Sequence, residues 1–161
     1  MKLLIANRGE IVSRIVKSCR KLDIIPCGVY SEADKNSTYV KFLYEAQNIG
    51  GLAASDSYLR MDKIVGAALQ LERDMIHPGY GFLAENPEFS EVCKRNGIIF
   101  VGPSPQVLKI SGDKLRAKQV VSRIAPVLEA KEVSTQEEAL KVAKEIGYPV
   151  ILKAARGGGG R

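Results

Sequence analysis

The sequence predicts an α/β protein: an open, mostly parallel, doubly wound sheet over residues 1–110, then the beginning of a second domain over residues 111–161. Short apolar runs alternate with segments of helical spacing through the first part. The connections between these runs are long enough for the crossover helices that parallel strands require. Beyond residue 111 a further helix and apolar run fall outside this rhythm, so we assign them to another domain.

The first elements follow in the order strand, helix, strand. Residues 2–7 form a short apolar run, and from Ile11 onward apolar residues recur at helical spacing. A second apolar run follows at Ile24–Ser31. Because the helical segment lies between the two runs, we expect the two strands to pair in parallel.

The same alternation continues to residue 102. We expect a helix around residues 61–69 and a strand at Asp74–His77. Asn86 is a suitable N-cap for a second helix, which Gly97 ends. A last strand is expected at Ile98–Gly102.

The second part begins with two helical stretches that meet at Ser111–Asp113. A further helix is expected at Gln136–Ile146, because Thr135 and Glu138 have the spacing of a capping box. The apolar run Pro149–Ala154 then predicts a strand. We expect this strand to belong to a domain that continues beyond residue 161.

Composition indicates an ordinary globular protein and argues against nucleic acid as a partner. Hydrophobic residues make up 45% of the 161 residues and charged residues 26%. The formal net charge of +6 suits anionic partners. Aromatic residues are only 6%, tryptophan is absent, and the basic residues are not interleaved with rings on which bases would stack.

The cysteines and the N-terminus indicate the compartment. Cys19, Cys27 and Cys93 are scattered within or beside apolar runs, which predicts free thiols in a reducing environment. Polar residues interrupt the N-terminal run too early for a signal peptide, and no stretch approaches the length of a membrane span. We therefore expect a cytoplasmic protein without a membrane partner, and the single histidine argues against a zinc site.

One glycine motif resembles a dinucleotide-binding turn. Residues 79–84 (GYGFLA) match the fingerprint, with alanine in the last place, and lie between a predicted strand and helix. The strand that follows lacks the acid that would bind a ribose. Glu32 does follow the second strand, but the turn at residues 7–10 that it would serve has one glycine. NAD binding is therefore not expected.

A second motif consists of four consecutive glycines: Gly157, Gly158, Gly159 and Gly160. Backbone N–H groups without neighbouring Cβ atoms can point toward one anion. Lys153 precedes the glycines, and Lys114 begins a predicted helix whose N-terminal amides we expect to be unpaired. Phosphate binding is one interpretation and a flexible linker is the other; these residues alone leave both open.

Five blocks of the sequence closely resemble, in order and spacing, the N-terminal part of biotin carboxylases. The blocks are IANRGEI (5–11), HPGYGFLAEN (77–86), FVGPS (100–104), GDK (112–114) and IGYPVILKAARGGGGR (146–161). The resemblance covers essentially the whole chain. It implies a Rossmann-like domain without a bound dinucleotide, followed by an incomplete ATP-grasp domain. It also implies an ATP-dependent ligase that activates bicarbonate with MgATP and carboxylates biotin on a carrier protein.

The resemblance also implies roles for single residues. Lys114, Lys153 and the four glycines match the family's ATP-binding lysines and its phosphate-covering loop, while Tyr80 and Gly81 match positions that approach biotin. The family's Mg²⁺ ligands and its catalytic residues fall beyond Arg161. We therefore expect no catalytic or metal-binding residue within the chain. The 161 residues alone should neither carboxylate biotin nor bind ATP tightly.

The partners that the resemblance implies are a biotin carboxyl carrier protein, a second copy of the chain and a carboxyltransferase subunit. Two alternatives stay open: another ATP-grasp ligase such as a carbamoyl-phosphate synthase, and a non-catalytic interaction module of a carboxylase complex. The residues themselves predict a structural hydrogen bond for His77 and an internal ion pair for Arg8 and Glu10. Simple packing is the alternative for Tyr80.

Overall fold

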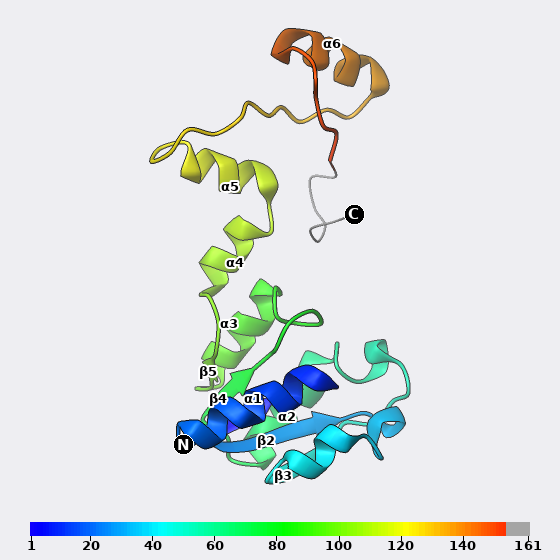
Figure 1. Ribbon diagram of the computed structural model, residues 1–161, viewed down its shortest axis with the longest axis vertical. Helices are drawn as coiled ribbons and strands as arrows, with labels where there is room; N and C mark the ends of the chain where they lie inside the picture. Colours follow the sequence, from blue (N-terminus) through cyan, green and yellow to red (C-terminus); the bar gives the residue numbers. More distant parts are fainter. Residues whose placement is uncertain (154–161) are drawn as a thin grey trace. The chain divides into compact units, whose positions relative to one another are not determined.

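Five parallel strands form one sheet in the computed structural model of the chain, which describes residues 1–153 (Figure 1). The strands are β1 (Lys2–Ile5), β2 (Ile25–Tyr30), β3 (Glu45–Asn48), β4 (Met75–His77) and β5 (Ile99–Phe100). The α-helices are α1 (Glu10–Lys21), α2 (Met61–Gln70), α3 (Pro87–Arg95), α4 (Pro105–Ser111), α5 (Lys114–Val121) and α6 (Gln136–Ile146). The chain divides into two compact units, Met1–Pro105 and a second unit that begins at Gln106.

The strand order is β3-β2-β1-β4-β5, so the chain runs outward from β1 in both directions. All four pairings are parallel, with Ile5 opposite Gly28 of β2 and opposite His77 of β4. The order reverses between β1 and β4. In open parallel sheets this reversal leaves a crevice at the carboxyl ends of the two strands, where ligands bind.

Helices cover both faces of the sheet (Figure 1). On β1, Leu3 and Ile5 pack with the apolar stripe of α1, because alternate side chains of a strand point to opposite faces. Leu4 and Ala6 point the other way and pack with α2 and α3. The predicted doubly wound sheet is therefore confirmed.

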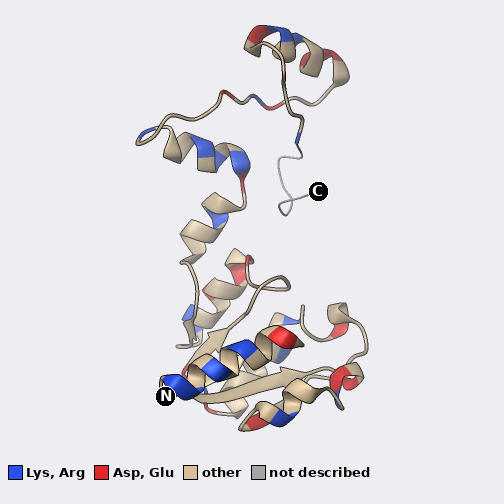
Figure 2. Cartoon of the chain, in the orientation of Figure 1, with Lys and Arg blue, Asp and Glu red and all other residues tan. Residues whose placement is uncertain are grey.

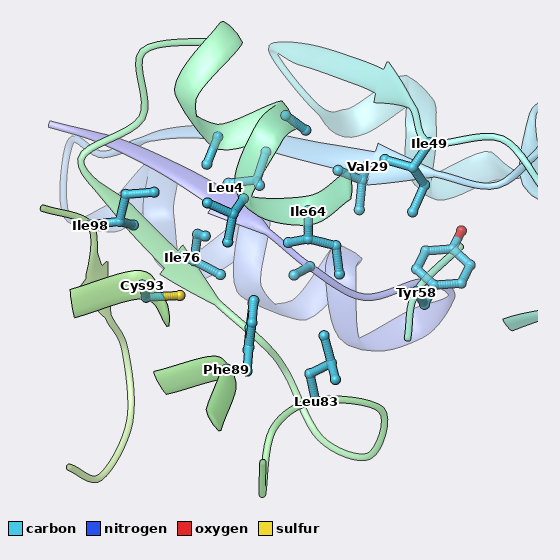
Figure 3. Close-up of a cluster of buried hydrophobic side chains, with 14 of the residues drawn as sticks. Leu4, Val29, Ile49, Tyr58, Ile64, Ile76, Leu83, Phe89, Cys93 and Ile98 are labelled. Atoms are coloured by element: carbon cyan, nitrogen blue, oxygen red, sulfur yellow. The ribbon is translucent and has the colours of Figure 1, made fainter. Parts of the chain in front are cut away.

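The larger core cluster lies on the side of α2 and α3. Figure 3 shows Leu4, Ile64 and Ile76 close together within it, and all three are fully buried. The ring of Phe89 lies edge-on to that of Phe100, with 5.8 Å between their centroids. Burying one such side chain contributes about 1.5–3 kcal/mol, so this cluster is a main source of stability for the first unit.

Helix α1 begins directly after the turn that follows β1. Gly9 is its N-cap and has a φ of 71°, a backbone conformation that side chains with a Cβ rarely adopt. Glu10 lies in the first turn, and Arg20 and Lys21 lie in the last (Figure 2). This arrangement of charges complements the helix dipole.

Strand β3 has no counterpart among the expected elements. Its four residues, EAQN, are polar or small and show no hydrophobic alternation. It forms at the sheet edge because β2 offers its free backbone groups there, with Cys27 opposite Glu45 and Tyr30 opposite Asn48. Pairing with β2, rather than the intrinsic preference of its residues, therefore makes this segment a strand.

The helices of the second unit form where local signals predict them. The capping box of α6 is present, with Thr135 accepting a hydrogen bond from the Glu138 amide and Glu138 bonding back. The predicted strand at Pro149–Ala154 is wrong for residues 149–153, which are not in a strand. Ala154 lies outside the described residues. An apolar run becomes a strand only where a neighbouring strand completes its hydrogen bonds, and no strand of the described residues pairs with it.

Candidate functional site

A hollow of about 400 Å³ lies where β1 and β4 end, at the point where the strand order reverses. The turn after β1 and the turn after β4 line it. The lining residues are Asn7, Arg8, Gly9, Glu10, Tyr80, Gly81 and Phe82. The structure therefore brings Tyr80 and Gly81, which the sequence singles out, into one hollow with the turn that leads into α1.

Asn7 joins the two turns. Its side-chain nitrogen donates to the carbonyl oxygens of Pro78, at 2.7 Å, and Tyr80, at 2.8 Å, while its oxygen accepts from the Arg8 amide. The residue is only 3% exposed, so these bonds are shielded from water. A Cβ on Gly79 would lie 2.6 Å from the Asn7 side-chain nitrogen, which requires glycine there. Asn7 thus fixes the position of the β4 turn on that of β1.

Tyr80 is 61% exposed, and its hydroxyl donates a hydrogen bond of 2.6 Å to Glu10. This bond raises the pKa of the Tyr80 phenol, because the carboxylate favours the protonated hydroxyl. Gly81 follows with a φ of 66°, and no heavy atom lies within 4 Å of the place that a Cβ would take. The ring of Tyr80 and the backbone of Gly81 are therefore accessible to a ligand.

Arg8 and Glu10 do not pair with each other, so the expected ion pair is wrong. Arg8 lies 3.4 Å from a carboxylate oxygen of Asp34, and its guanidinium lies 5.9 Å from the ring centre of Tyr58. Glu10 instead accepts from the Tyr80 hydroxyl. Both residues do link the first turn to neighbouring segments, each to a different one.

A buried polar network supports this side of the hollow. The Tyr58 hydroxyl donates to Asp34 at 2.8 Å, accepts from the Ser31 amide and lies 2.9 Å from the Tyr39 hydroxyl. Burial raises the pKa of Asp34, but hydrogen bonds from Tyr58, Ser31 and Arg8 outweigh it and lower that pKa overall. Sequence reasoning missed this network, since its members come from four separate segments and share no motif.

His77, the last residue of β4, makes the structural hydrogen bond that the sequence predicts. Its Nδ1 accepts a hydrogen bond of 3.0 Å from the Gly79 amide. Burial lowers the pKa of the imidazole, and the nearby charge of Arg14 lowers it further. The neutral form is therefore favoured, as an accepting nitrogen requires.

Two of the phosphate-binding candidates, Lys114 and Lys153, lie in the described part of the second unit. Lys114 is the first residue of α5, but the amides of this helix are not all unpaired as expected. Asp113 is the N-cap and accepts from Leu115 and Arg116, both at 3.1 Å. Lys153 is exposed and is the last described residue. The four glycines at 157–160 lie outside the described residues.

Two further observations concern the described part of the chain. Within residues 1–153, no group of three His, Cys, Asp or Glu side chains is placed to coordinate a metal ion. In the same residues, every helix is too short or too polar to cross a lipid bilayer. All three cysteines are buried free thiols, as predicted.

Comparison with known families gives two consecutive matches. Residues 1–108 match the biotin carboxylase N-terminal domain family. Residues 113–161 match the family of the ATP-binding domain of the carbamoyl-phosphate synthase L chain. The chain thus contains the matched regions in the order that the sequence blocks predict.

Individual relatives are similar over nearly the whole chain. Biotin carboxylase 1 of Bacillus subtilis is 47% identical and the biotin carboxylase of a Nostoc species is 45% identical, each over 99% of this chain. Both alignments cover 36% of the relative, so the chain spans about a third of the length of these proteins.

Solved structures agree with these relatives. The biotin carboxylase domain dimer of Hydrogenobacter thermophilus 2-oxoglutarate carboxylase, in complex with MgADP, ADP and bicarbonate, is 45% identical with a TM-score of 0.92. A biotin carboxylase β,γ-ATP complex from Campylobacter jejuni is 47% identical with a TM-score of 0.93. Each alignment covers 99% of this chain and 36% of the other.

Proposed function

This chain belongs to the biotin carboxylase N-terminal domain family, and we propose from that premise that it acts as the N-terminal part of a biotin carboxylase. Such an enzyme uses MgATP and bicarbonate to carboxylate biotin on a carrier protein. The observation that carries the proposal is the accessible Tyr80–Gly81 turn at the reversal of strand order, within a chain whose residues 1–108 match this family.

We assign the biotin-facing role to Tyr80 and Gly81. The hollow offers an exposed aromatic ring and, at Gly81, an exposed residue with open space where a side chain would stand. A bicyclic ring with a ureido group suits such a surface, because an aromatic face packs on its apolar part and backbone groups can bond its polar part. These residues bind and orient the biotin ring in this proposal.

We assign ATP binding to the second unit, through Lys114, Lys153 and the glycines Gly157, Gly158, Gly159 and Gly160. Bound ATP supplies the phosphoryl group that activates bicarbonate. The two ammonium groups would balance the negative charge of its phosphates, and the glycine amides would cover them. Within residues 1–153 no group of three His, Cys, Asp or Glu side chains is placed to hold a metal ion, so we assign no Mg²⁺ ligand among these residues.

The proposal includes a domain boundary, a compartment and partners. We place the N-terminal domain at residues 1–110 and the start of the ATP-grasp domain at 111–161, near the division of the two units after Pro105. Partners would be a biotin carrier protein, a carboxyltransferase and a second copy of the chain, as the dimer of the Hydrogenobacter domain suggests. A cytoplasmic location accords with the three free thiols.

A chimera tests the proposal. Residues 1–161 replace the matching segment of Bacillus subtilis biotin carboxylase 1, to which they are 47% identical. We expect biotin-dependent fixation of labelled bicarbonate. Replacing Lys153 with alanine should lower kcat/KM for ATP by about 100-fold, since removing one charge-stabilising group at a reacting centre costs this much.

The matched control is Lys94→Ala, which removes an exposed lysine of α3 in the first unit, outside the residues that we assign to ATP binding. This variant should keep the activity of the chimera. A folded chimera that hydrolyses ATP without carboxylating biotin would contradict the proposal. It would favour another ATP-grasp ligase, in line with the match of residues 113–161.

A further inference from the structure

Tyr80 is fixed at both ends although most of its side chain is exposed. Its backbone carbonyl accepts from the Asn7 side chain at 2.8 Å, and its hydroxyl donates to Glu10 at 2.6 Å. Asn7 lies in the turn between β1 and α1 and Glu10 is the first residue of α1, so both partners are about 70 positions away in sequence. An exposed tyrosine has two free side-chain torsions unless a partner restricts them, so the bond to Glu10 selects one orientation of the ring. The bond from Asn7 holds the backbone that carries it.

The bond to Glu10 has the geometry of a strong hydrogen bond. An O–H donor and a carboxylate approach each other to about 2.5–2.7 Å when the bond is charge-assisted, and the observed separation lies in that range. Glu10 is in turn favourably placed, because it lies in the first turn of α1, where the helix dipole favours negative charge. The helix therefore supports the carboxylate that orients the phenol.

We propose that Glu10 is a positioning residue for the biotin site: its carboxylate orients the ring of Tyr80, while Asn7 fixes the backbone beneath it. The role rests on the proposed function. It also specifies what Tyr80 presents to a ligand. The hydroxyl proton is already donated to Glu10, so the ring face and the oxygen lone pairs remain for contact with the ligand.

The first test measures the phenol itself, in the 161-residue chain. The main cause of the raised pKa of Tyr80 is its hydrogen bond to Glu10. The charge of Arg14, which also lies on α1, lowers that pKa. The guanidinium of Arg8 lies on the same hollow. The titration curve of Tyr80 is obtained by subtracting the tyrosinate absorbance of the matching Tyr80→Phe variant from that of each protein. We expect Glu10→Gln to move the Tyr80 titration to lower pH.

Glu88→Gln is the matched control for this titration. Glu88 also lies in the first turn of a helix, α3, so the variant loses a similar interaction with a helix dipole. Glu88 is not among the residues that line the hollow around Tyr80, so the Glu88→Gln variant should leave the Tyr80 titration unchanged. A Tyr80 titration that Glu10→Gln does not move, or that Glu88→Gln moves equally, would overturn the positioning role.

The second test measures biotin, with the active chimera. Glu10→Ala should raise KM for free biotin by roughly tenfold with a smaller change in kcat, because misoriented contact groups weaken binding. Glu10→Gln retains an acceptor oxygen and should restore part of the loss. In a Tyr80→Phe background the effect of Glu10→Ala should disappear, since two residues that act through one bond are not additive.

The outcomes separate the two proposals. The positioning role is overturned, and the proposed function left intact, by an active chimera in which Glu10→Ala leaves KM for biotin unchanged. The same holds if Glu10→Ala raises KM as much in the Tyr80→Phe background as in the parent chimera. A chimera without carboxylation activity overturns the proposed function and, with it, the role of Glu10 toward biotin. The tyrosine titration reports the Glu10–Tyr80 bond in either case.

Discussion

Tertiary packing stabilises the first unit of the chain, whereas local signals define most of the described structure of the second unit. In the first unit, strands and helices close over two clusters of buried side chains, one on each face of the sheet. Among the described residues from Gln106 on, only Leu108 and Ala143 are buried. The helices of the second unit are thus defined by caps and local spacing, while those of the first unit are also fixed by distant contacts.

This difference has an energetic consequence. An isolated helix shorter than about 12–15 residues is marginal in water, and most helical stability comes from packing of an apolar face. Helix α6 has 11 residues, and Leu140 on it is 52% exposed. We expect the first unit to unfold cooperatively and the described part of the second unit to contribute little to that transition.

The largest expected effect comes from removing the same side chain in each unit. Leu4→Ala deletes a fully buried leucine of β1 and should lower the free energy of unfolding by about 2–5 kcal/mol, through lost burial and the cavity left behind. Leu140→Ala makes the same chemical change on α6 and should stay within about 0.5 kcal/mol. Urea denaturation followed by tyrosine fluorescence measures the effect of both changes on the transition of the first unit, because only Tyr148 of the six tyrosines lies beyond that unit.

Equal losses in the two leucine variants would break the comparison. They would mean that α6 packs within the cooperative unit rather than forming from local signals. A loss confined to Leu4→Ala would support the division after Pro105 as an energetic boundary as well as a geometric one.

A smaller effect is expected from removing one hydroxyl. Tyr58→Phe deletes a buried group that donates to Asp34 and accepts from the Ser31 amide, which leaves both without that partner. Because an unsatisfied buried polar group costs about 1–3 kcal/mol, the first unit should lose stability of that order. Tyr148→Phe removes a hydroxyl from a tyrosine that is 67% exposed and should change little. The same denaturation experiment compares them, and a neutral Tyr58→Phe would show that the network contributes nothing to stability.

The sequence predicts the fold well where the signals are local. The cap Asn86 accepts from the amides of Glu88 and Phe89, and α3 begins at the next residue, Pro87. The capping box places the start of α6 equally well. The sequence does not predict β3, and its predicted strand is wrong over residues 149–153, for the same reason. Whether a short segment is a strand depends on a neighbouring strand, which the segment itself does not encode.

The candidate site divides in the same way. The sequence makes Tyr80 and Gly81 candidates because they lie in one turn that resembles the biotin carboxylase family, and the structure places both in the lining of the hollow. The roles of Asn7 and Glu10 could not be found from the sequence, since their bonds to Tyr80 span the reversal of strand order and exist only once β1 and β4 lie side by side. Asp34 and Tyr58 likewise meet only through the fold. The sequence alone therefore does not predict the hydrogen bonds that connect separate segments of this site.

The smallest expected effect is a difference between the two units in how their stability depends on pH. The only histidine, His77, lies in the first unit, and burial together with Arg14 lowers its pKa in the folded state. The unfolded chain, with an ordinary pKa of about 6.5, binds a proton more readily. The stabilising contribution is therefore fully present above about pH 6.5 and is lost as the pH falls through the folded pKa.

The imidazole resonances of His77 in a proton NMR titration should give a pKa below the ordinary value. Between pH 7 and pH 5.5 the first unit should lose some stability, and His77→Gln should reduce this dependence. The second unit contains no histidine, so its helicity should not change over this range; a parallel change in both units would contradict their independence.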